Sequence, residues 1–212
     1  MGIVKNGLHG EPNGEVGGVI YYQRMGKTVC RIKGLRKKGS SENQLVDQAK
    51  MAVVSKFISK ILEFATVGYK AIARRENRIA YNMVTSELKR NGWKVAGSKI
   101  VLDFEKMVLS KGNLVIPEQV SIQPVPTGIE FKWHVDPKMP WSESTDQVML
   151  LAYFPQSKKV LSLLYGPFRT AGSCILPVSA PMLSKNMHTF ISFISSDRTD
   201  ASNGIYAGNL NL

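Results

Sequence analysis

Residues 129–135 read Ile129-Glu130-Phe131-Lys132-Trp133-His134-Val135, an alternation of apolar and polar side chains. Successive side chains of a β-strand point to opposite faces, so the four apolar residues share one face and Trp133 is predicted to lie in a core. On both sides of this stretch, similar short segments recur about every ten residues, separated by turns that contain Gly, Pro, Asn, Asp or Ser. We predict strands at residues 98–104, 106–109, 119–123, 128–135, 147–154, 159–165, 173–177, 188–195 and 204–210.

Many short strands joined by such turns are typical of an antiparallel sandwich or barrel. The Cys…Trp…Cys framework of true immunoglobulin domains is absent, because the two cysteines, Cys30 and Cys174, lie far apart in different halves of the chain. The topology is therefore predicted to be immunoglobulin-like only. Both cysteines lie in apolar, strand-like runs and are predicted to be buried free thiols.

Upstream of these strands the hydrophobic period is close to 3.6 residues, which is typical of helices. Residues 41–44 (Ser-Glu-Asn-Gln) form a capping box, and apolar side chains recur over residues 45–64 at steps of three or four. Residues 66–68 (Thr-Val-Gly) interrupt the pattern, and a second helical stretch is predicted over residues 69–89. Residues 89–92 (Lys-Arg-Asn-Gly) predict its end with a left-handed cap. We favour two antiparallel helices, with one long kinked helix as the alternative.

The first 40 residues have a third pattern. Five glycines between residues 7 and 18 indicate a flexible or tightly turned lead-in. Residues 18–23 and 28–33 are predicted strands of a β-hairpin, joined by a turn at residues 24–27 and followed by a basic linker. The predicted fold class is α+β: an N-terminal β-hairpin and a helical hairpin, then an antiparallel immunoglobulin-like β-sandwich. The predicted domains are residues 1–40, 41–92 and 93–212.

The positive charge is concentrated at the front of the chain. The formal net charge is +12, and residues 1–95 carry +11 of it. Such a surface favours acidic partners, including nucleic acid. Tyr21, Tyr22 and Tyr69 are candidates for stacking on bases. The candidate binding residues on the hairpin, linker and second helix are Lys27, Arg31, Lys33, Arg36, Lys37, Lys38, Arg74, Arg75 and Arg78.

No catalytic, metal or cofactor constellation is present in the sequence. The three histidines have no partner at a metal-ligand spacing, and the pair His134 and Asp136 suits a turn. Asp103 and Glu105, two apart on a predicted strand, are a weak candidate for acid–base chemistry and more typical of a solvated face. The glycine series precedes a hairpin instead of a helix, so a nucleotide-binding loop is rejected. We therefore predict no cofactor and no enzymatic activity.

No stretch of 18 apolar residues and no signal-peptide pattern occur in the sequence. Membrane insertion is not expected. A cytoplasmic protein, or one assembled into a particle and released without a Sec signal, fits this pattern.

Several short motifs, in the same order, resemble an uncharacterised family (a domain of unknown function) of small basic proteins associated with Bacteroidota. They are the hairpin at residues 14–31, the pair Tyr81-Asn82, the element Ser110-Lys111-Gly112-Asn113-Leu114, and the C-terminal patterns at residues 193–197 and 202–208. Cys30 departs from the plain strand residue expected there. The resemblance covers nearly the whole chain and implies the same architecture, but it implies no activity.

The parts together favour a non-enzymatic structural or interaction protein that forms homo-oligomers. A hairpin on a mobile linker can add a strand to a neighbouring sheet, as in filaments, surface layers or phage particles. The candidate assembly residues are Val19, Ile20, Tyr21 and Tyr22. The alternative is a nucleic-acid-binding protein that uses the basic half. A hydrolase using Asp103 and Glu105 is a distant third hypothesis.

Overall fold

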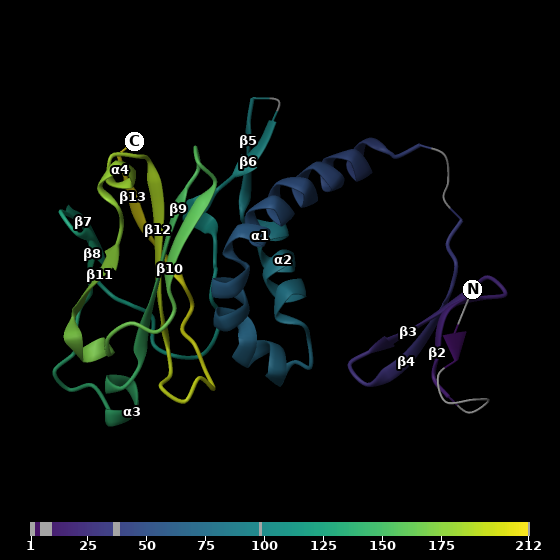
Figure 1. The fold of residues 1–212 in the computed structure, drawn as a ribbon, viewed down its shortest axis with the longest axis horizontal. Helices are drawn as coiled ribbons and strands as arrows, with labels where there is room; N and C mark the ends of the chain where they lie inside the picture. The colour runs from purple at the N-terminus through teal and green to yellow at the C-terminus, as the bar shows by residue number, and fades with distance from the viewer. Residues whose placement is uncertain (1–2, 5–9, 36–38, 98, 212) are drawn as a thin grey trace. The chain divides into compact units, whose positions relative to one another are not determined.

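A computed structural model of the protein describes residues 3–4, 10–35, 39–97 and 99–211. The chain divides into two compact units, residues 1–44 and residues 45–212 (Figure 1). The second unit contains both helical stretches, apart from residues 42–44 at the start of the first, and all the sheets of the later half. The fold thus combines helices with antiparallel sheets, as predicted.

The first unit is a small antiparallel sheet. Its strands are β1 (Ile3–Val4), β2 (Pro12–Val16), β3 (Val19–Arg24) and β4 (Lys27–Ile32), paired in that order. The predicted hairpin is confirmed as β3 and β4, and the glycine-rich lead-in contains the further strand β2. Two-residue turns at Gly17-Gly18 and Met25-Gly26 have positive φ at both residues, the geometry that matches the twist of hairpin strands.

The helical segment begins as predicted but breaks elsewhere. The Ser41 amide donates to Gln44 Oε1 at 3.0 Å and the Gln44 amide donates to Ser41 Oγ at 3.4 Å, which confirms the capping box. Helix α1 (Glu42–Arg75) then continues through residues 66–68, so the predicted interruption there is wrong. Gly68 is present because Ser110 packs against it: a Cβ at Gly68 would lie 2.7 Å from Ser110 Cβ.

The chain reverses at Asn77 instead. Asn77 has a φ of +51°, its amide donates to Arg74 O at 3.2 Å, and the Arg78 amide donates to Ala73 O at 2.8 Å. This is a Schellman motif. Helix α2 (Ala80–Asn91) follows and ends where predicted. Gly92 has a φ of −88°, so the predicted left-handed cap is wrong, and its amide donates to Leu88 O instead.

The second unit contains two larger antiparallel sheets. One has the strand order β10 (Lys159–Leu163), β9 (Gln147–Phe154), β12 (Met187–Ile194) and β13 (Ile205–Leu210). The other has the order β11 (Ser173–Pro177), β8 (Gly128–Lys132) and β7 (Ser121–Val125). Seven predicted strands are therefore confirmed, with ends that shift by up to three residues.

The remaining elements are short. Strands β5 (Trp93–Ala96) and β6 (Lys99–Leu102) form a separate hairpin, of which only β6 was predicted. The strand predicted at residues 106–109 is absent, and a 3-10 helix at Phe104–Lys106 precedes an extended segment there. The other short elements are helices α3 (Trp141–Ser144) and α4 (Ala180–Leu183) and a 3-10 helix at Arg169–Ala171.

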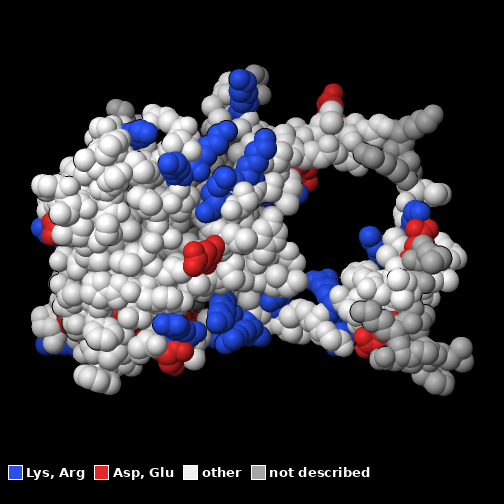
Figure 2. Space-filling model, in the orientation of Figure 1, with Lys and Arg blue, Asp and Glu red and all other residues white. Residues whose placement is uncertain are grey.

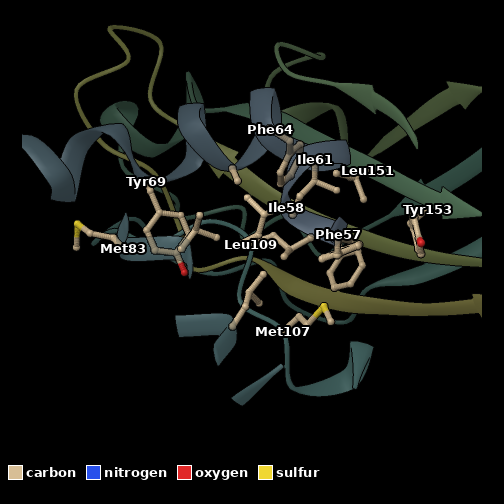
Figure 3. Packing of buried hydrophobic residues seen from close by; sticks show 14 of the residues in the cluster. Phe57, Ile58, Ile61, Phe64, Tyr69, Met83, Met107, Leu109, Leu151 and Tyr153 are labelled. Atoms are coloured by element: carbon tan, nitrogen blue, oxygen red, sulfur yellow. The ribbon is translucent and has the colours of Figure 1, made fainter. Parts of the chain in front are cut away.

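Both faces of strand β9 are covered, one by the helices and one by the three-stranded sheet. Met149, Leu151 and Tyr153 pack with α1 and α2 (Figure 3), whereas the residues between them pack with β8 and β11. A strand buried on both faces is a continuous apolar run, as this one is. The predicted core position of Trp133 is confirmed: it is 5% exposed and packs edge-on against Phe193.

Candidate functional site

The N-terminal sheet is a surface without a core. Among its described residues none is buried. Val16, Val19 and Ile32 lie opposite one another across β2, β3 and β4, and the side chains of Val16 and Ile32 are 52% and 83% exposed. These three residues therefore form an apolar row across the sheet, and the described residues of the first unit do not bury it.

The four predicted assembly residues all lie on β3 but on both of its faces. Val19 and Tyr21 share the face of Ile32, and Ile20 and Tyr22 share the opposite face. All four are partly buried. Cys30 is exposed, so its predicted burial is wrong, because the described residues of the first unit form a single sheet without a second layer of their own. Cys174 is buried as predicted.

The cations of the hairpin lie along its edge strand β4 and just after it. Lys27 and Arg31 form no ion pair with a carboxylate of the described ranges, whereas Lys33 Nζ lies 2.9 Å from Glu15 Oε2. Arg36, Lys37 and Lys38 lie outside the described residues. The edge strand is therefore cationic as well as unpaired on its outer side.

The arginines of the helical segment are partly neutralised within the chain. Arg75 Nη2 lies 2.6 Å from Asp200 Oδ2, and Arg78, in the turn after α1, pairs with Glu76 at 3.2 Å. Arg74 is exposed and forms no ion pair among the residues that the structure describes. Two of the three arginines are thus held by carboxylates of their own chain.

A hollow of about 140 Å³ lies beside α3, and sequence analysis did not predict it. Its acidic rim consists of Glu118, Asp136 and Glu143. Two large side chains close in sequence to its lining residues are exposed: Trp141, two positions before Glu143 on α3, is 83% exposed, and Phe168, directly before Arg169, is 50% exposed. We call these five residues the acidic–aromatic surface.

The buried base of this surface is an Arg–Asp pair. Arg169 donates from Nη1 to Val115 O at 3.0 Å and from Nη2 to Ile116 O at 3.2 Å, and Nη1 lies 3.7 Å from Asp146 Oδ2. Burial raises the pKa of Asp146 to about 6, against the opposing effect of Arg169. Burial likewise lowers the pKa of Arg169 from its ordinary value. Arg169 thus holds the backbone at Val115 and Ile116, two residues before Glu118.

The weak acid–base candidates of the sequence have structural surroundings. Asp103 is 5% exposed and lies 3.5 Å from Lys94 Nζ and 3.8 Å from Lys106 Nζ, while Glu105 is in the 3-10 helix that follows. Asp136 Oδ1 accepts a hydrogen bond from the Lys138 amide at 2.8 Å. This bond belongs to the turn that was predicted for His134 and Asp136. Residues 3–4, 10–35, 39–97 and 99–211 contain no cluster of three His, Cys, Asp or Glu that would hold a metal.

His188 is a partly buried histidine of strand β12 with a lowered pKa. Its ring stacks on Phe104 with centroids 3.8 Å apart, and Nδ1 lies 2.9 Å from Tyr206 Oη. Burial, aided by the charge of Lys94, lowers the pKa of His188 to about 4. The ring is therefore neutral at physiological pH.

No helix formed by the described residues has the length and apolar character needed to cross a membrane.

Comparison with known proteins adds a family and no activity. No curated protein matches the chain. A crystal structure of the chicken CNTN1 FN1-FN3 domains matches with 11% identity and a TM-score of 0.31, covering 52% of this chain and 33% of that one. This chain thus spans about a third of that structure's length. A family model matches residues 11–208, which confirms the resemblance to an uncharacterised family, while the association with Bacteroidota stays a prediction. The chain belongs to the family of unknown function DUF6266.

Proposed function

We propose that this protein is a non-enzymatic interaction protein that self-associates through its N-terminal sheet. The observation that carries the proposal is that no described residue of the first 44 is buried, although Val16 and Ile32 present an apolar row. A small sheet with one uncovered apolar face is marginally stable in water. Binding to another surface would cover that face and stabilise the sheet.

A second copy of the chain is the occupant that the charges favour. Residues 1–44 contain eight Lys or Arg and three Glu, so one N-terminal sheet repels another. The acidic–aromatic surface offers the complementary sign, with Glu118 and Glu143 beside the exposed Trp141. Exposed tryptophans are frequent at the centres of interfaces.

The contact we propose joins the basic sheet of one copy to the acidic–aromatic surface of another. Such a contact uses two different patches, so it continues from copy to copy unless a rotation closes it into a ring. Filaments, surface layers and particles are assemblies of this kind. Lys27 and Arg31 on the edge strand β4 disfavour edge-to-edge pairing of two basic sheets.

Sedimentation velocity of the full chain over a range of concentrations tests self-association. We expect the sedimentation coefficient to rise with concentration, and the rise to be lost in the variant Val16→Asp/Ile32→Asp. Val95→Asp is the matched control, because Val95 is a 64% exposed β-branched residue on the β5 strand of the second unit. A concentration-independent, monomeric wild-type protein would refute the proposal.

An exchange of charges between the two patches tests whether the acidic–aromatic surface binds the N-terminal sheet of another copy. Arg31→Glu and Glu143→Arg should each weaken association, because each places like charges at the contact. An equimolar mixture of the two variants should regain part of it. Weakening by Arg31→Glu alone, with no effect of Glu143→Arg, would show that the sheet binds elsewhere on the second copy.

Nucleic acid is the alternative partner, and the unpaired Lys27 and Arg31 favour it. The pairing of Arg75 with Asp200 and of Arg78 with Glu76 counts against it. Six phosphate contacts would give a log–log salt slope of about −5 for affinity. Retention on a DNA column should then fall steeply with salt, and nuclease treatment should dissolve any assembly. Assembly that survives nuclease supports self-association instead.

We also infer that the β-rich part is immunoglobulin-like. Two facing antiparallel sheets share a core around Trp133, which supports this topology. An experimental structure with a different strand order would contradict the inference.

A further inference from the structure

A second hollow, of about 370 Å³, lies between α1, the end of β6 and strand β9. Its floor is apolar and aromatic, formed by Val53, Phe57, Leu102 and Tyr153. Three lysines line it as well: Lys56 and Lys60 from α1, and Lys158 from the turn between β9 and β10. We call this hollow the lysine pocket. Its residues come from three segments up to about a hundred positions apart.

The three lysines have no counter-charge of their own. None forms an ion pair with a carboxylate within the part of the chain that the structure describes. Other lysines of the second unit do: Lys89 pairs with Asp47 and Lys111 with Glu87. Lys56 and Lys60 are four residues apart on one helix, where like charges repel. An anion between them would relieve that repulsion.

Cationic side chains visibly gather in this region. Figure 2 shows a group of Lys and Arg side chains in the upper middle of the view, where Figure 1 draws α1 close to β9 and to the β5–β6 hairpin. Three cations at a hollow with an apolar floor therefore produce a positive field there. Low-dielectric walls strengthen such a field.

The floor adds one polar group. Tyr153 is 7% exposed and its ring meets Phe57 edge-on, with centroids 5.0 Å apart. Its hydroxyl makes no hydrogen bond within the described ranges and lies at a hollow. Burial raises the pKa of Tyr153, so the hydroxyl keeps its proton at neutral pH and can donate it to an oxyanion.

We propose that the lysine pocket binds an anionic amphiphile, a molecule with a phosphate or carboxylate head group and a short apolar body. The lysines and the Tyr153 hydroxyl would hold the head group, and the floor of Val53, Phe57 and Leu102 would cover the body. The volume falls at the lower end of the ~300–1,000 Å³ typical of small-molecule pockets. This site belongs to the second unit and does not depend on the proposed self-association.

The apolar floor is the reason to prefer an amphiphile to a plain anion. Inorganic phosphate would satisfy the lysines but leave the floor wet, and a neutral alcohol would cover the floor but leave three cations unpaired. Inorganic phosphate therefore lacks the apolar contribution to the binding free energy, and the alcohol lacks the ionic contribution, whereas an amphiphile has both.

Isothermal titration calorimetry of the full chain with octyl phosphate, octanoate, octanol and inorganic phosphate tests the proposal. We expect octyl phosphate or octanoate to bind at least tenfold more tightly than octanol or inorganic phosphate. The stronger of the two identifies the head group. Equal binding of octanol would show a merely apolar hollow, equal binding of phosphate would show a merely anionic site, and either result overturns the proposal.

Variants locate the site. Lys56→Gln/Lys60→Gln/Lys158→Gln should weaken binding at least tenfold, and Leu102→Trp should block the hollow while leaving all three lysines in place. Lys70→Gln/Lys99→Gln/Lys185→Gln is the matched control, because it removes the same charge from lysines that line neither this pocket nor the acidic–aromatic surface. Equal loss in the control would refute a specific site. Sedimentation of the same variants should be unchanged, which separates this result from the fate of the self-association proposal.

Discussion

Gly68 lies in the middle of a long helix because a neighbouring segment leaves no room for a side chain. Ser110 Oγ donates to Gly68 O at 3.3 Å and the Lys111 amide donates to the same oxygen at 3.0 Å. The same serine donates to Ser202 O at 2.8 Å. A single close approach thus ties α1 to two distant segments.

The substitution Gly68→Ala should lower the free energy of unfolding by about 1–3 kcal/mol, because the added Cβ overpacks this contact. In an open helix the same change would raise it by about 1 kcal/mol. Urea denaturation measures the difference, with the exposed Ser59→Ala in the same helix as control. A Gly68→Ala protein as stable as the wild type would contradict the close approach.

His188 should make the fold acid-sensitive. Its pKa is about 4 in the folded protein against 6.5 unfolded, so the neutral ring contributes stability that is complete above pH 6.5 and is lost as the pH falls through 4. The loss amounts to roughly 3 kcal/mol at most. Urea denaturation from pH 7 to pH 4 should show it, and His188→Gln should remove it.

Asp146 acts in the opposite direction over the same range. Its raised pKa of about 6 means that the folded state keeps a proton that the unfolded state has lost, so this group lowers stability as the pH rises from about 4 to 6. The difference between wild type and His188→Gln isolates the histidine. A difference that does not change with pH would contradict its lowered pKa.

At the scale of elements, the turn between α1 and α2 depends on Asn77. A non-glycine residue with left-handed φ costs roughly 1–2 kcal/mol, and Asn tolerates that region better than most residues. Asn77→Ala should therefore lower the free energy of unfolding by about 1 kcal/mol, while Asn77→Gly should keep or raise it. Urea denaturation of the pair decides this. Equal stability of both variants would show that the turn is not strained.

Elements with strong periodicity were predictable, and short ones were not. The strands at residues 147–154 and 173–177 were predicted with their observed ends. Met107 and Leu109 are buried like alternate residues of a strand, but their backbone pairs with no strand. Alternation of apolar side chains indicates which residues are buried. It does not indicate whether the backbone forms hydrogen bonds with another strand, because that partner is distant in the sequence.

At the scale of the whole molecule, the second unit should fold without the first. The two buried clusters contain no residue before Val54. A protein of residues 41–212, which keeps the Ser41 cap, should unfold cooperatively at the melting temperature of the full chain in circular dichroism. A large drop in melting temperature would mean that the N-terminal sheet stabilises this core.

The period of each segment, and so the order of hairpin, helices and sheets, could be read from the residues alone, because burial of one face is a local pattern. Tertiary structure alone decided that α1 continues through Gly68, since the reason is a contact with Ser110, 42 residues away. It also decided which charges remain unpaired. Lys56, Lys60 and Lys158 meet around one hollow only after the chain has folded, and no spacing along the chain encodes that meeting.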